Sequence, residues 1–202
     1  MTPYPDKVGA VVLAGGDARR MGGADKPLLA VGGQAMLARV IAALDLADIA
    51  ISANGDPSRF DGFGLPVLPD GEFAGQGPLA GILAGLDWAE GLGATALLTV
   101  PCDTPFVPTG LASALAPAPA CAASGGQAHH LVALWPMTCR HALRRHLSML
   151  NRRDVRHFAV MIGMRRVDFP PGKWDPFLNV NTPEELAQAR ALAEQLGTEG
   201  AT

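Results

Sequence analysis

Glycines and a lysine are combined in the segment from Leu13 to Lys26, which reads LAGGDARRMGGADK. Glycines allow backbone N–H groups to approach phosphate oxygens closely, and a following lysine supplies the countercharge. The chain holds only three lysines (Lys7, Lys26 and Lys173), so a lysine in this segment stands out. A Gly-Gly pair after a strand is often only a tight turn, whereas the full pattern L-A-G-G-x-x-x-R-M-G-x-x-x-K is far more specific. The segment therefore predicts a phosphate-binding loop.

Two well-known phosphate loops do not fit this segment. A Walker A loop needs G-x-x-x-x-G-K-[ST], but Lys26 is preceded by Asp25 and followed by Pro27. The dinucleotide fingerprint G-x-G-x-x-G fails as well, because position 18 is alanine and no G-x-G is formed there. The loop belongs to neither class.

Polar side chains follow three further predicted strands, namely Asn54, Asp70 and Asp103. In open α/β sheets, ligands bind beyond the carboxyl ends of the strands. Magnesium prefers one or two carboxylates, retained waters and substrate phosphate oxygens. A single Asp after a strand is more often a turn or cap residue, but two acids at two strand ends, together with Lys26, favour a nucleotide–metal site.

Short apolar runs alternate with amphipathic stretches along the chain. The expected strands cover residues 8–13, 49–53, 65–68, 96–100, 131–135 and 165–169. The expected helices cover residues 35–44 and 78–89, a short stretch after Pro108, the basic stretch between the last two strands, and 183–196. The last helix has Thr182 as its N-cap, Pro183 at its first position and a capping-box glutamate, and we expect it to end at Gly197. This alternation predicts an α/β three-layer sandwich with a mainly parallel sheet.

Length and composition set further bounds. A chain of 202 residues fits one domain, 1–202, with frayed tails at about 1–7 and 197–202. The net charge of −3 argues against nucleic acid as the main partner. Three cysteines without C-x-x-C spacing rule out a disulfide framework and a standard zinc site. No apolar run approaches the ~20 residues of a membrane span, so we expect a cytoplasmic protein without a membrane partner.

The charges are unevenly distributed. Residues 1–139 carry a net charge of −6, whereas residues 140–166 hold eight arginines against one acid, Asp154. This basic segment is either a solvated helical face or a patch that faces a phosphorylated substrate or an acidic protein.

A few other residues could carry chemistry. We expect Cys102 to be a small packed residue, because no His or Asn partner arrangement accompanies it. We expect His129 and His130 to be an exposed loop pair, with a metal site or substrate contact as the alternative. Asn179 and Asn181 alternate along an extended segment and so share a face, unless they are only turn residues before Thr182.

The chain resembles the molybdenum cofactor guanylyltransferases, within the wider Rossmann-like nucleotidyltransferases, over roughly residues 8–196. The resemblance rests on LAGGDARRMGGADKPLL, Asn54, Asp70, GPLAGILAGL at 77–86, CDTPFVP at 102–108 and FLNVNTPEEL at 177–186. The LAGG form, where many sugar and cytidylyl relatives carry LAAG, resembles the guanine-using branch. Pro27 departs slightly from the family, in which small residues are common after the lysine.

The resemblance implies transfer of GMP from GTP to the phosphate of molybdopterin, or of its molybdenum-loaded form, with release of pyrophosphate. The implied GTP-binding residues are Leu13, Ala14, Gly15, Lys26, Asn54, Asp70 and Asp103. Arg20, Lys26 and Asp103 would be the catalytic residues, with Asp103 also the ligand of Mg²⁺, the implied cofactor. Gly23, Asn179 and Asn181 would line the reacting end on the acceptor side, together with Arg20. Whether Asp70 contacts the base or the ribose stays open, and we expect a monomer that meets acidic cofactor-biosynthesis or acceptor proteins.

Two rival functions remain. One is a related nucleotidyltransferase with another base or acceptor, such as cytidylyl transfer to the same pterin or activation of a sugar phosphate. Comparing GTP with CTP turnover separates these. The other is a carrier module that binds the nucleotide and delivers the cofactor without releasing pyrophosphate. The presence of Lys26 and Asp103 disfavours this carrier function.

Overall fold

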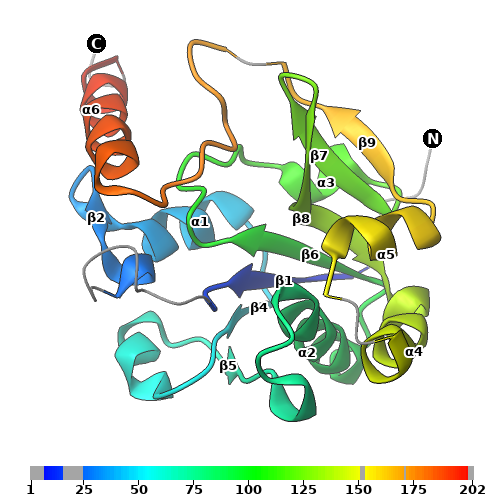
Figure 1. Ribbon diagram of the computed structural model, residues 1–202. Helices are drawn as coiled ribbons and strands as arrows, with labels where there is room; N and C mark the ends of the chain where they lie inside the picture. Colours follow the sequence, from blue (N-terminus) through cyan, green and yellow to red (C-terminus); the bar gives the residue numbers. More distant parts are fainter. Residues whose placement is uncertain (1–6, 16–24, 151–152, 171, 200–202) are drawn as a thin grey trace.

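A seven-stranded sheet lies at the centre of the computed structural model, which describes residues 7–15, 25–150, 153–170 and 172–199 (Figure 1). The strands lie in the order β5 (Val67–Leu68), β4 (Ile49–Ser52), β1 (Val8–Leu13), β6 (Ala96–Pro101), β8 (Gln127–Pro136), β7 (Ala120–Ser124) and β9 (Arg165–Asp168). Only β8 runs antiparallel to its neighbours in this sheet. The prediction of a mainly parallel sheet is confirmed.

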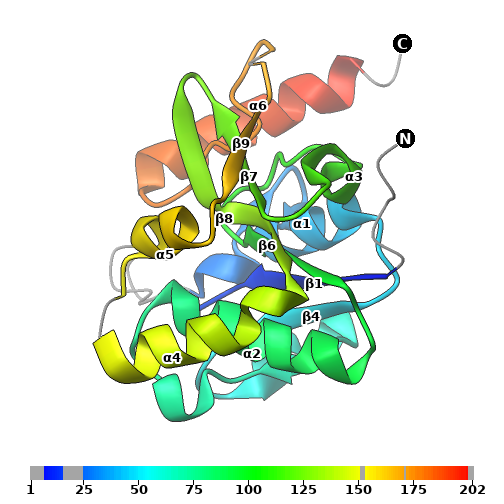
Figure 2. The ribbon, with the colours of Figure 1, turned by 90° about the vertical axis from the view of Figure 1, so that its right-hand side faces the viewer.

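Helices cover both faces of the sheet (Figures 1 and 2). On one face lie α1 (Met36–Leu44) and α3 (Leu111–Leu115). On the other lie α2 (Pro78–Gly91), α4 (Arg140–Leu150) and α5 (Val155–Met161). Strand β1 is buried along its whole length, and its residues alternate between the two apolar cores. A strand buried on both sides reads as a continuous apolar run, as this one does, and the three-layer sandwich is confirmed.

Helix α2 packs closely on the sheet through two glycines of the GPLAGILAGL motif. A Cβ atom at Gly81 would lie 2.4 Å from Oγ of Ser52. A Cβ atom at Gly85 would lie 2.8 Å from Cγ2 of Val11 and 2.9 Å from Cδ2 of Leu97. The small residues of this motif are therefore needed for close packing on β1, β4 and β6.

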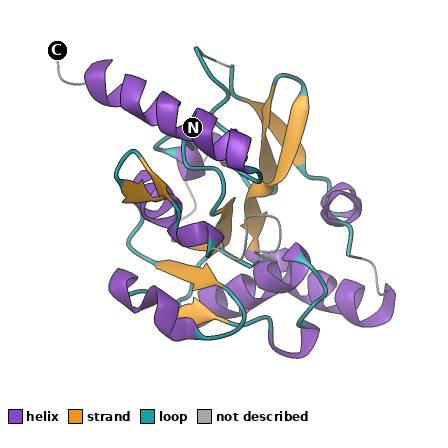
Figure 3. Ribbon diagram, turned by 60° about the vertical axis from the view of Figure 1, so that its left-hand side comes forward, coloured by secondary structure: helices purple, strands orange, loops and turns teal. Residues whose placement is uncertain are grey.

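Helix α6 (Pro183–Glu199) packs on a separate hairpin of β2 (Ala30–Val31) and β3 (Gln34–Ala35), as Figure 3 shows. A third apolar cluster joins the two: Val31 of the hairpin and Met36 at the start of α1 pack with Leu186, Ala189 and Ala193 of α6. The predicted capping box is confirmed: Thr182 Oγ1 accepts from the N–H of Glu185 at 3.2 Å, and Glu185 Oε2 accepts from the N–H of Thr182 at 3.0 Å. This helix therefore fixes the position of the segment that precedes it.

Four expectations about the elements were wrong. The stretch after Pro27, expected to be a loop, forms the 3-10 helix η2 (Lys26–Leu28) and the hairpin of β2 and β3. Strand β7 was not expected, and β8 is longer than residues 131–135, because the Gly125-Gly126 turn, with φ of +54° and +81°, closes a hairpin. Helix α6 passes through Gly197 to Glu199, since a glycine weakens a helix without having to end it. Strand β5 covers only two residues and not 65–68.

The remaining described elements are short 3-10 helices: η3 (Pro57–Phe63), η4 (Gly71–Phe73) and η5 (Met137–Cys139). Of the expected frayed tails, residues 1–6 and 200–202 lie outside the described residues, whereas Lys7 accepts a hydrogen bond from the N–H of Thr95 at 2.9 Å. Among the described helices, none combines the length and apolar character that crossing a membrane requires.

Candidate functional site

The carboxyl ends of three parallel strands meet at one edge of the sheet. Leu13, at the end of β1, pairs with Ser52 of β4 and with Pro101 of β6. The residues that follow these strands are held together by backbone hydrogen bonds from Ala14 to Ser52 (2.8 Å) and from Cys102 to Leu13 (3.0 Å). The edge from which the expected site residues leave the sheet is thus a continuous part of the fold.

Lys26 joins two other predicted site residues at this edge. Its Nζ donates to Oδ2 of Asp103 at 2.7 Å and to Oδ1 of Asn181 at 2.6 Å. The side chains of Lys26 and Asp103 are each only 20% exposed, so solvent screens their ion pair less than it would at the surface. The carbonyl of Asp103 also accepts from the N–H of Val180 at 2.9 Å, which fixes the Asn181 segment beside β6. Residues far apart in the sequence therefore form one compact cluster.

The oxygens around Lys26 are the kind that a hard cation prefers. Asp103 contributes a carboxylate and Asn181 an amide oxygen, and both converge on one positive group. The described residues contain no group of three or more His, Cys, Asp or Glu side chains able to hold a metal by themselves. The arrangement fits a cation that takes one protein carboxylate and completes its shell with water and phosphate oxygens, as magnesium does.

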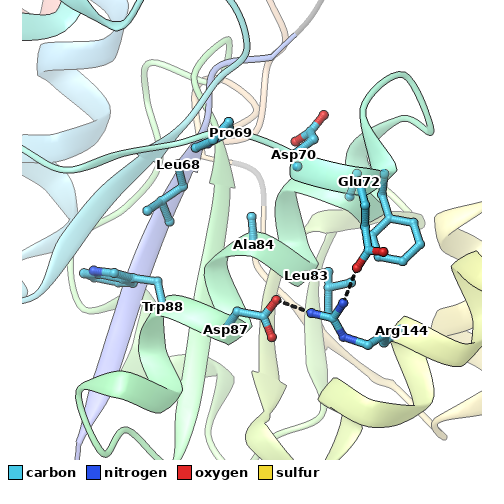
Figure 4. Close-up of a pocket in the computed structure, with 12 residues that line it drawn as sticks. Leu68, Pro69, Asp70, Glu72, Leu83, Ala84, Asp87, Trp88 and Arg144 are labelled. Atoms are coloured by element: carbon cyan, nitrogen blue, oxygen red, sulfur yellow. Dashed lines mark hydrogen bonds and ion pairs between the residues drawn. The ribbon is translucent and has the colours of Figure 1, made fainter.

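Asn54 and Asp70 form a reciprocal pair at the ends of β4 and β5. Asn54 Nδ2 donates to Oδ2 of Asp70 at 2.6 Å, and the N–H of Asp70 donates to Oδ1 of Asn54 at 3.0 Å. The two bonds fix both loops relative to one another. Figure 4 shows the carboxylate of Asp70 pointing away from Arg144 and from the ion pairs below it.

Arg59 of η3, which no sequence motif indicated, contacts this pair and the start of η2. Its Nη1 donates to Oδ1 of Asp25 at 2.9 Å, and its Nη2 donates to the carbonyl of Asn54 at 3.3 Å. Its guanidinium lies 4.4 Å from the centre of the Phe60 ring. Nothing local in the sequence marks Arg59, because its partners are 34 and 5 residues away and belong to other loops.

The other expected residues of the glycine-rich segment are only partly described. Leu13 and Ala14 are buried, whereas Gly15 is exposed and an added Cβ there would meet no described atom within 4 Å. Arg20 and Gly23 lie outside the described residues. Among the described residues, none would contact a Cβ added at Gly15, at the edge where β1 ends.

Asn179 and Asn181 flank a buried residue, Val180, and Asn181 is half-buried. Asn179 is exposed, and the N–H of Asn181 donates to Oε2 of Glu185 at 2.6 Å. Asn181 reaches Lys26, whereas Asn179 forms no contact with it among the described hydrogen bonds. The structure thus brings one of the two asparagines into the Lys26 cluster.

The expectation that His129 and His130 form an exposed loop pair was wrong. Both lie in β8, because the hairpin continues to Gly125-Gly126. His129 Nε2 lies 2.7 Å from Oγ of Ser124, which itself donates to Oδ1 of Asp175 at 2.8 Å. The His129 ring packs 4.9 Å from the ring of Phe177, and burial lowers the pKa of His129. These contacts connect the hairpin to the segment that carries Asn181.

Cys102 is packed, as expected. Its side chain is buried, and burial, with a smaller contribution from the charge of Asp103, raises the pKa of the Cys102 thiol to about 12. A thiol with such a pKa is almost fully protonated near neutral pH and is a poor nucleophile.

Part of the basic segment is used inside the molecule. Arg140 pairs with Asp87 at 2.8 Å and with Glu90 at 2.7 Å, and Arg144 pairs with Asp87 and Glu72 (Figure 4). These contacts join α4 to α2 and to η4 beside a pocket of about 310 Å³. Arg165 donates to the carbonyls of Leu115 and Pro117.

Three other described arginines of the segment lie near the site edge or near β8. A Cβ at Gly77, the residue before α2, would lie 3.9 Å from Cβ of Arg153. The charges of Arg166 and Arg156 add to the effect of burial in lowering the pKa of His130. Arg140, Arg144 and Arg165 are therefore used in internal contacts, whereas Arg153, Arg156 and Arg166 are exposed.

Known proteins resemble the chain in sequence and in fold. Residues 10–161 match the MobA-like NTP transferase domain family. A molybdenum cofactor guanylyltransferase from Acidiphilium cryptum is 50% identical over 94% of this chain and 97% of its own. One from Rhodopseudomonas palustris is 46% identical over 91% of this chain and 93% of its own.

Among solved structures, molybdopterin-guanine dinucleotide biosynthesis protein A from Archaeoglobus fulgidus superimposes with a TM-score of 0.70. The two sequences are 20% identical, and the match covers 92% of this chain and 98% of the other, so the likeness is one of fold. Together with the sequence matches, which span nearly the whole chain, it gives one assignment. The chain belongs to the molybdenum cofactor guanylyltransferase family of MobA-like NTP transferases.

Proposed function

We propose that this protein transfers GMP from GTP to the phosphate of molybdopterin, or of its molybdenum-loaded form, and releases pyrophosphate. Relatives named molybdenum cofactor guanylyltransferase, which are 43–50% identical over most of this chain, support the proposal. The observation that carries it is the Lys26 ammonium, held at 2.7 Å by Asp103 and at 2.6 Å by Asn181 at the edge where the glycine-rich segment begins.

The reaction needs no activated side-chain nucleophile, because the attacking group is already a phosphate. Catalysis is then the alignment of that phosphate with the α-phosphorus of GTP and the screening of the charge that develops there. Lys26 supplies a fixed positive charge for the triphosphate, and Arg20 would add a second one. Asp103, with the amide oxygen of Asn181 beside it, would hold a divalent cation that we take to be Mg²⁺ and that screens phosphate charge when bound.

Lys26 and Asp103 form an ion pair and neutralise one another. Asp103 would hold the metal ion through its carboxylate, and Lys26 would donate to a phosphate oxygen of the triphosphate. The ion pair therefore keeps two partly buried charges compensated until the substrate replaces both partners.

The two ends of the nucleotide have separate proposed partners. The backbone of Leu13, Ala14 and Gly15 meets the guanine edge, and the exposed position of Gly15 at the end of β1 supports this assignment. Asn54 and Asp70 hold the base or ribose side of the nucleotide. Their reciprocal hydrogen bonds make this part of the site rigid.

The acceptor pterin lies on the side of Gly23, Asn179 and Asn181 in this proposal. The exposed arginines Arg153, Arg156 and Arg166 would form the surface for the acceptor or for an acidic protein partner. Changing Arg153 together with Arg152, which lies outside the described residues, to alanine should raise the acceptor concentration required, with unchanged affinity for GTP. No change in either quantity would assign the segment to a solvated surface.

The test is pyrophosphate release from each of the four nucleoside triphosphates, with and without molybdopterin. We expect GTP to be preferred over CTP and ATP by at least ~10-fold, equivalent to about 1.4 kcal/mol, and release to depend on molybdopterin. Equal use of CTP would contradict guanylyl transfer. Binding of GTP without pyrophosphate release would identify a carrier module instead.

A cytoplasmic location and a monomeric state belong to the same proposal. The three cysteines, Cys102, Cys121 and Cys139, are free and buried, which suits a reducing compartment. Cell fractionation and sedimentation analysis test the two statements.

A further inference from the structure

Arg59 lies in a segment that none of the recognised motifs includes. Helix η3, which carries it, is capped at both ends. The side chain of Asp56 accepts from the N–H of Ser58 at 2.9 Å, and Gly64 ends the helix with φ of +62°. Phe60 anchors η3, since its side chain is 1% exposed. Arg59 therefore extends from a short element that is held at both ends and by its core residue.

The two hydrogen bonds of Arg59 join two loops of the proposed GTP site. One partner, the carboxylate of Asp25, belongs to the residue directly before Lys26, and the carbonyl of Asp25 accepts from the N–H of Leu28 at 2.9 Å to begin η2. The other partner is the carbonyl of Asn54, whose side chain is bonded to Asp70. A single guanidinium thus connects the Lys26 turn to the Asn54–Asp70 pair.

We propose that Arg59 is a positioning residue for GTP, which fixes the distance between Lys26 and the Asn54–Asp70 pair. The inference rests on the proposed function, in which Lys26 meets the triphosphate while Asn54 and Asp70 meet the base or ribose. Both ends of one nucleotide must be bound at once, so a variable distance between these loops weakens binding. Arg59 acts through Asp25 and Asn54 and does not itself contact the nucleotide.

Arginine suits this role and lysine does not. The planar guanidinium donates in two directions at once and stacks on an aromatic face, whereas an ammonium is a compact point charge. Arg59 uses all of these properties, with Asp25 and the Asn54 carbonyl as acceptors and the Phe60 ring below it. Lysine at this position could retain the charge attraction to Asp25 but not the three contacts together.

A purely structural role would give a different result from a positioning role. The side chains of Arg59 and Asp25 are 31% and 28% exposed, and ion pairs of this kind contribute little to folding stability. An ion pair of similar exposure joins Lys7 to Asp48 at 3.2 Å, and Lys7 precedes β1 at its amino end, opposite the site. The Lys7 pair is therefore a matched control for the Arg59 pair.

The experiment compares the wild type with Arg59→Lys, Arg59→Met, Asp25→Asn and the control Lys7→Met. For each protein, GTP affinity is measured by titration calorimetry, kcat and KM by pyrophosphate release, and unfolding by urea. We expect both Arg59 variants to raise the Kd and KM for GTP at least ~5-fold, with kcat within ~2-fold of the wild type. We expect the urea midpoint of Arg59→Met to match that of Lys7→Met. We expect Lys7→Met to bind GTP with wild-type affinity.

A combination of variants tests the route through Asp25. Adding Asp25→Asn to Arg59→Met should weaken GTP binding by less than the sum of the two single effects, because both remove the same contact. Wild-type GTP affinity in Arg59→Met would overturn the positioning role. The role would also be overturned if GTP binding fell only in proportion to the smaller fraction of folded protein. A wild type that binds GTP but releases no pyrophosphate would contradict the proposed function alone, and one that does not bind GTP would contradict both.

Discussion

The charge balance around Lys26 makes Asp103 the residue whose replacement is most informative. The carboxylate of Asp103 is the only acidic group among the described residues that bonds to Lys26, and the other acceptor, Asn181, is neutral. Removing the charge of Asp103 therefore leaves the Lys26 ammonium without an anionic partner and the proposed cation without its carboxylate.

Asp103→Asn keeps the shape of the side chain and removes its charge. We expect the variant to fold and to lose at least ~100-fold in GMP transfer, equivalent to about 2.7 kcal/mol of transition-state stabilisation. Excess magnesium should restore only part of the loss. Asp48→Asn, which changes the ion pair with Lys7 outside the site, is the control. Normal turnover of Asp103→Asn in limiting magnesium would show that the metal assignment is wrong. Asp70 would then be the candidate metal ligand.

The buried thiols give a second prediction for single residues. Burial raises the pKa values of Cys102 and Cys139 to about 12, above the value near 9 of an exposed thiol. The folded state therefore holds these protons more tightly than the unfolded chain does. We expect the free energy of unfolding to be unaffected by these thiols below about pH 9 and to fall as the pH rises from about 9 towards 12. We expect a thiol reagent at pH 8 to label the two residues only as the protein unfolds. Rapid labelling of the native protein would contradict their burial.

At the scale of elements, the contact between α2 and the sheet depends on the absence of side chains. Gly81 and Gly85 face β4, β1 and β6 at distances that a Cβ atom cannot occupy without movement of its neighbours. The same helix begins beside the proposed site and carries Asp87, the partner of Arg140 and Arg144. Its distance from the sheet therefore affects both the core and the attachment of α4.

Gly85→Ala should destabilise the protein by about 1–3 kcal/mol, because the added methyl group would overlap Val11 and Leu97. Gly91→Ala, at the end of the same helix, is the matched control, since a Cβ there meets no described atom within 4 Å. The control should stay within about 1 kcal/mol of the wild type, because alanine favours a helix over glycine. Urea denaturation measures both, and equal stabilities would contradict the close packing.

The sequence predicts those elements whose signals are local. The β-branched, apolar run of β1 and the capping box of α6 were recognised because their residue types alone specify them. Strand β7 reads ACAAS, and its small residues give no such signal although all of them are buried. Its place in the sheet depends on pairing with β8 and β9.

The candidate site divides in the same way. Lys26, Asn54, Asp70, Asp103 and Asn181 follow strands or belong to a motif, so the sequence indicated them. Arg59 and the Ser124–His129–Asp175 contacts come from residues without a motif, which only the folded chain brings together.

On the scale of the whole molecule, we propose that residues 1–202 form one cooperative domain. The tryptophans report on separate regions: Trp88 lies in α2, Trp135 is buried in β8, and Trp174 precedes the Asn181 segment. We expect tryptophan fluorescence and far-ultraviolet circular dichroism to give one coincident urea transition. Separate transitions for the two signals would divide the chain into independent units.

The bond between Lys26 and Asn181 spans 155 positions of the chain, and it has a consequence for protein synthesis. A ribosome makes β1, η2 and β6 long before it makes α6, whose Leu186, Ala189 and Ala193 complete the apolar cluster around Val31. A nascent chain that already contains the residues of every strand therefore still lacks the completed Lys26 cluster. Because we propose that the domain folds as one cooperative unit, incomplete products of translation would not acquire the site.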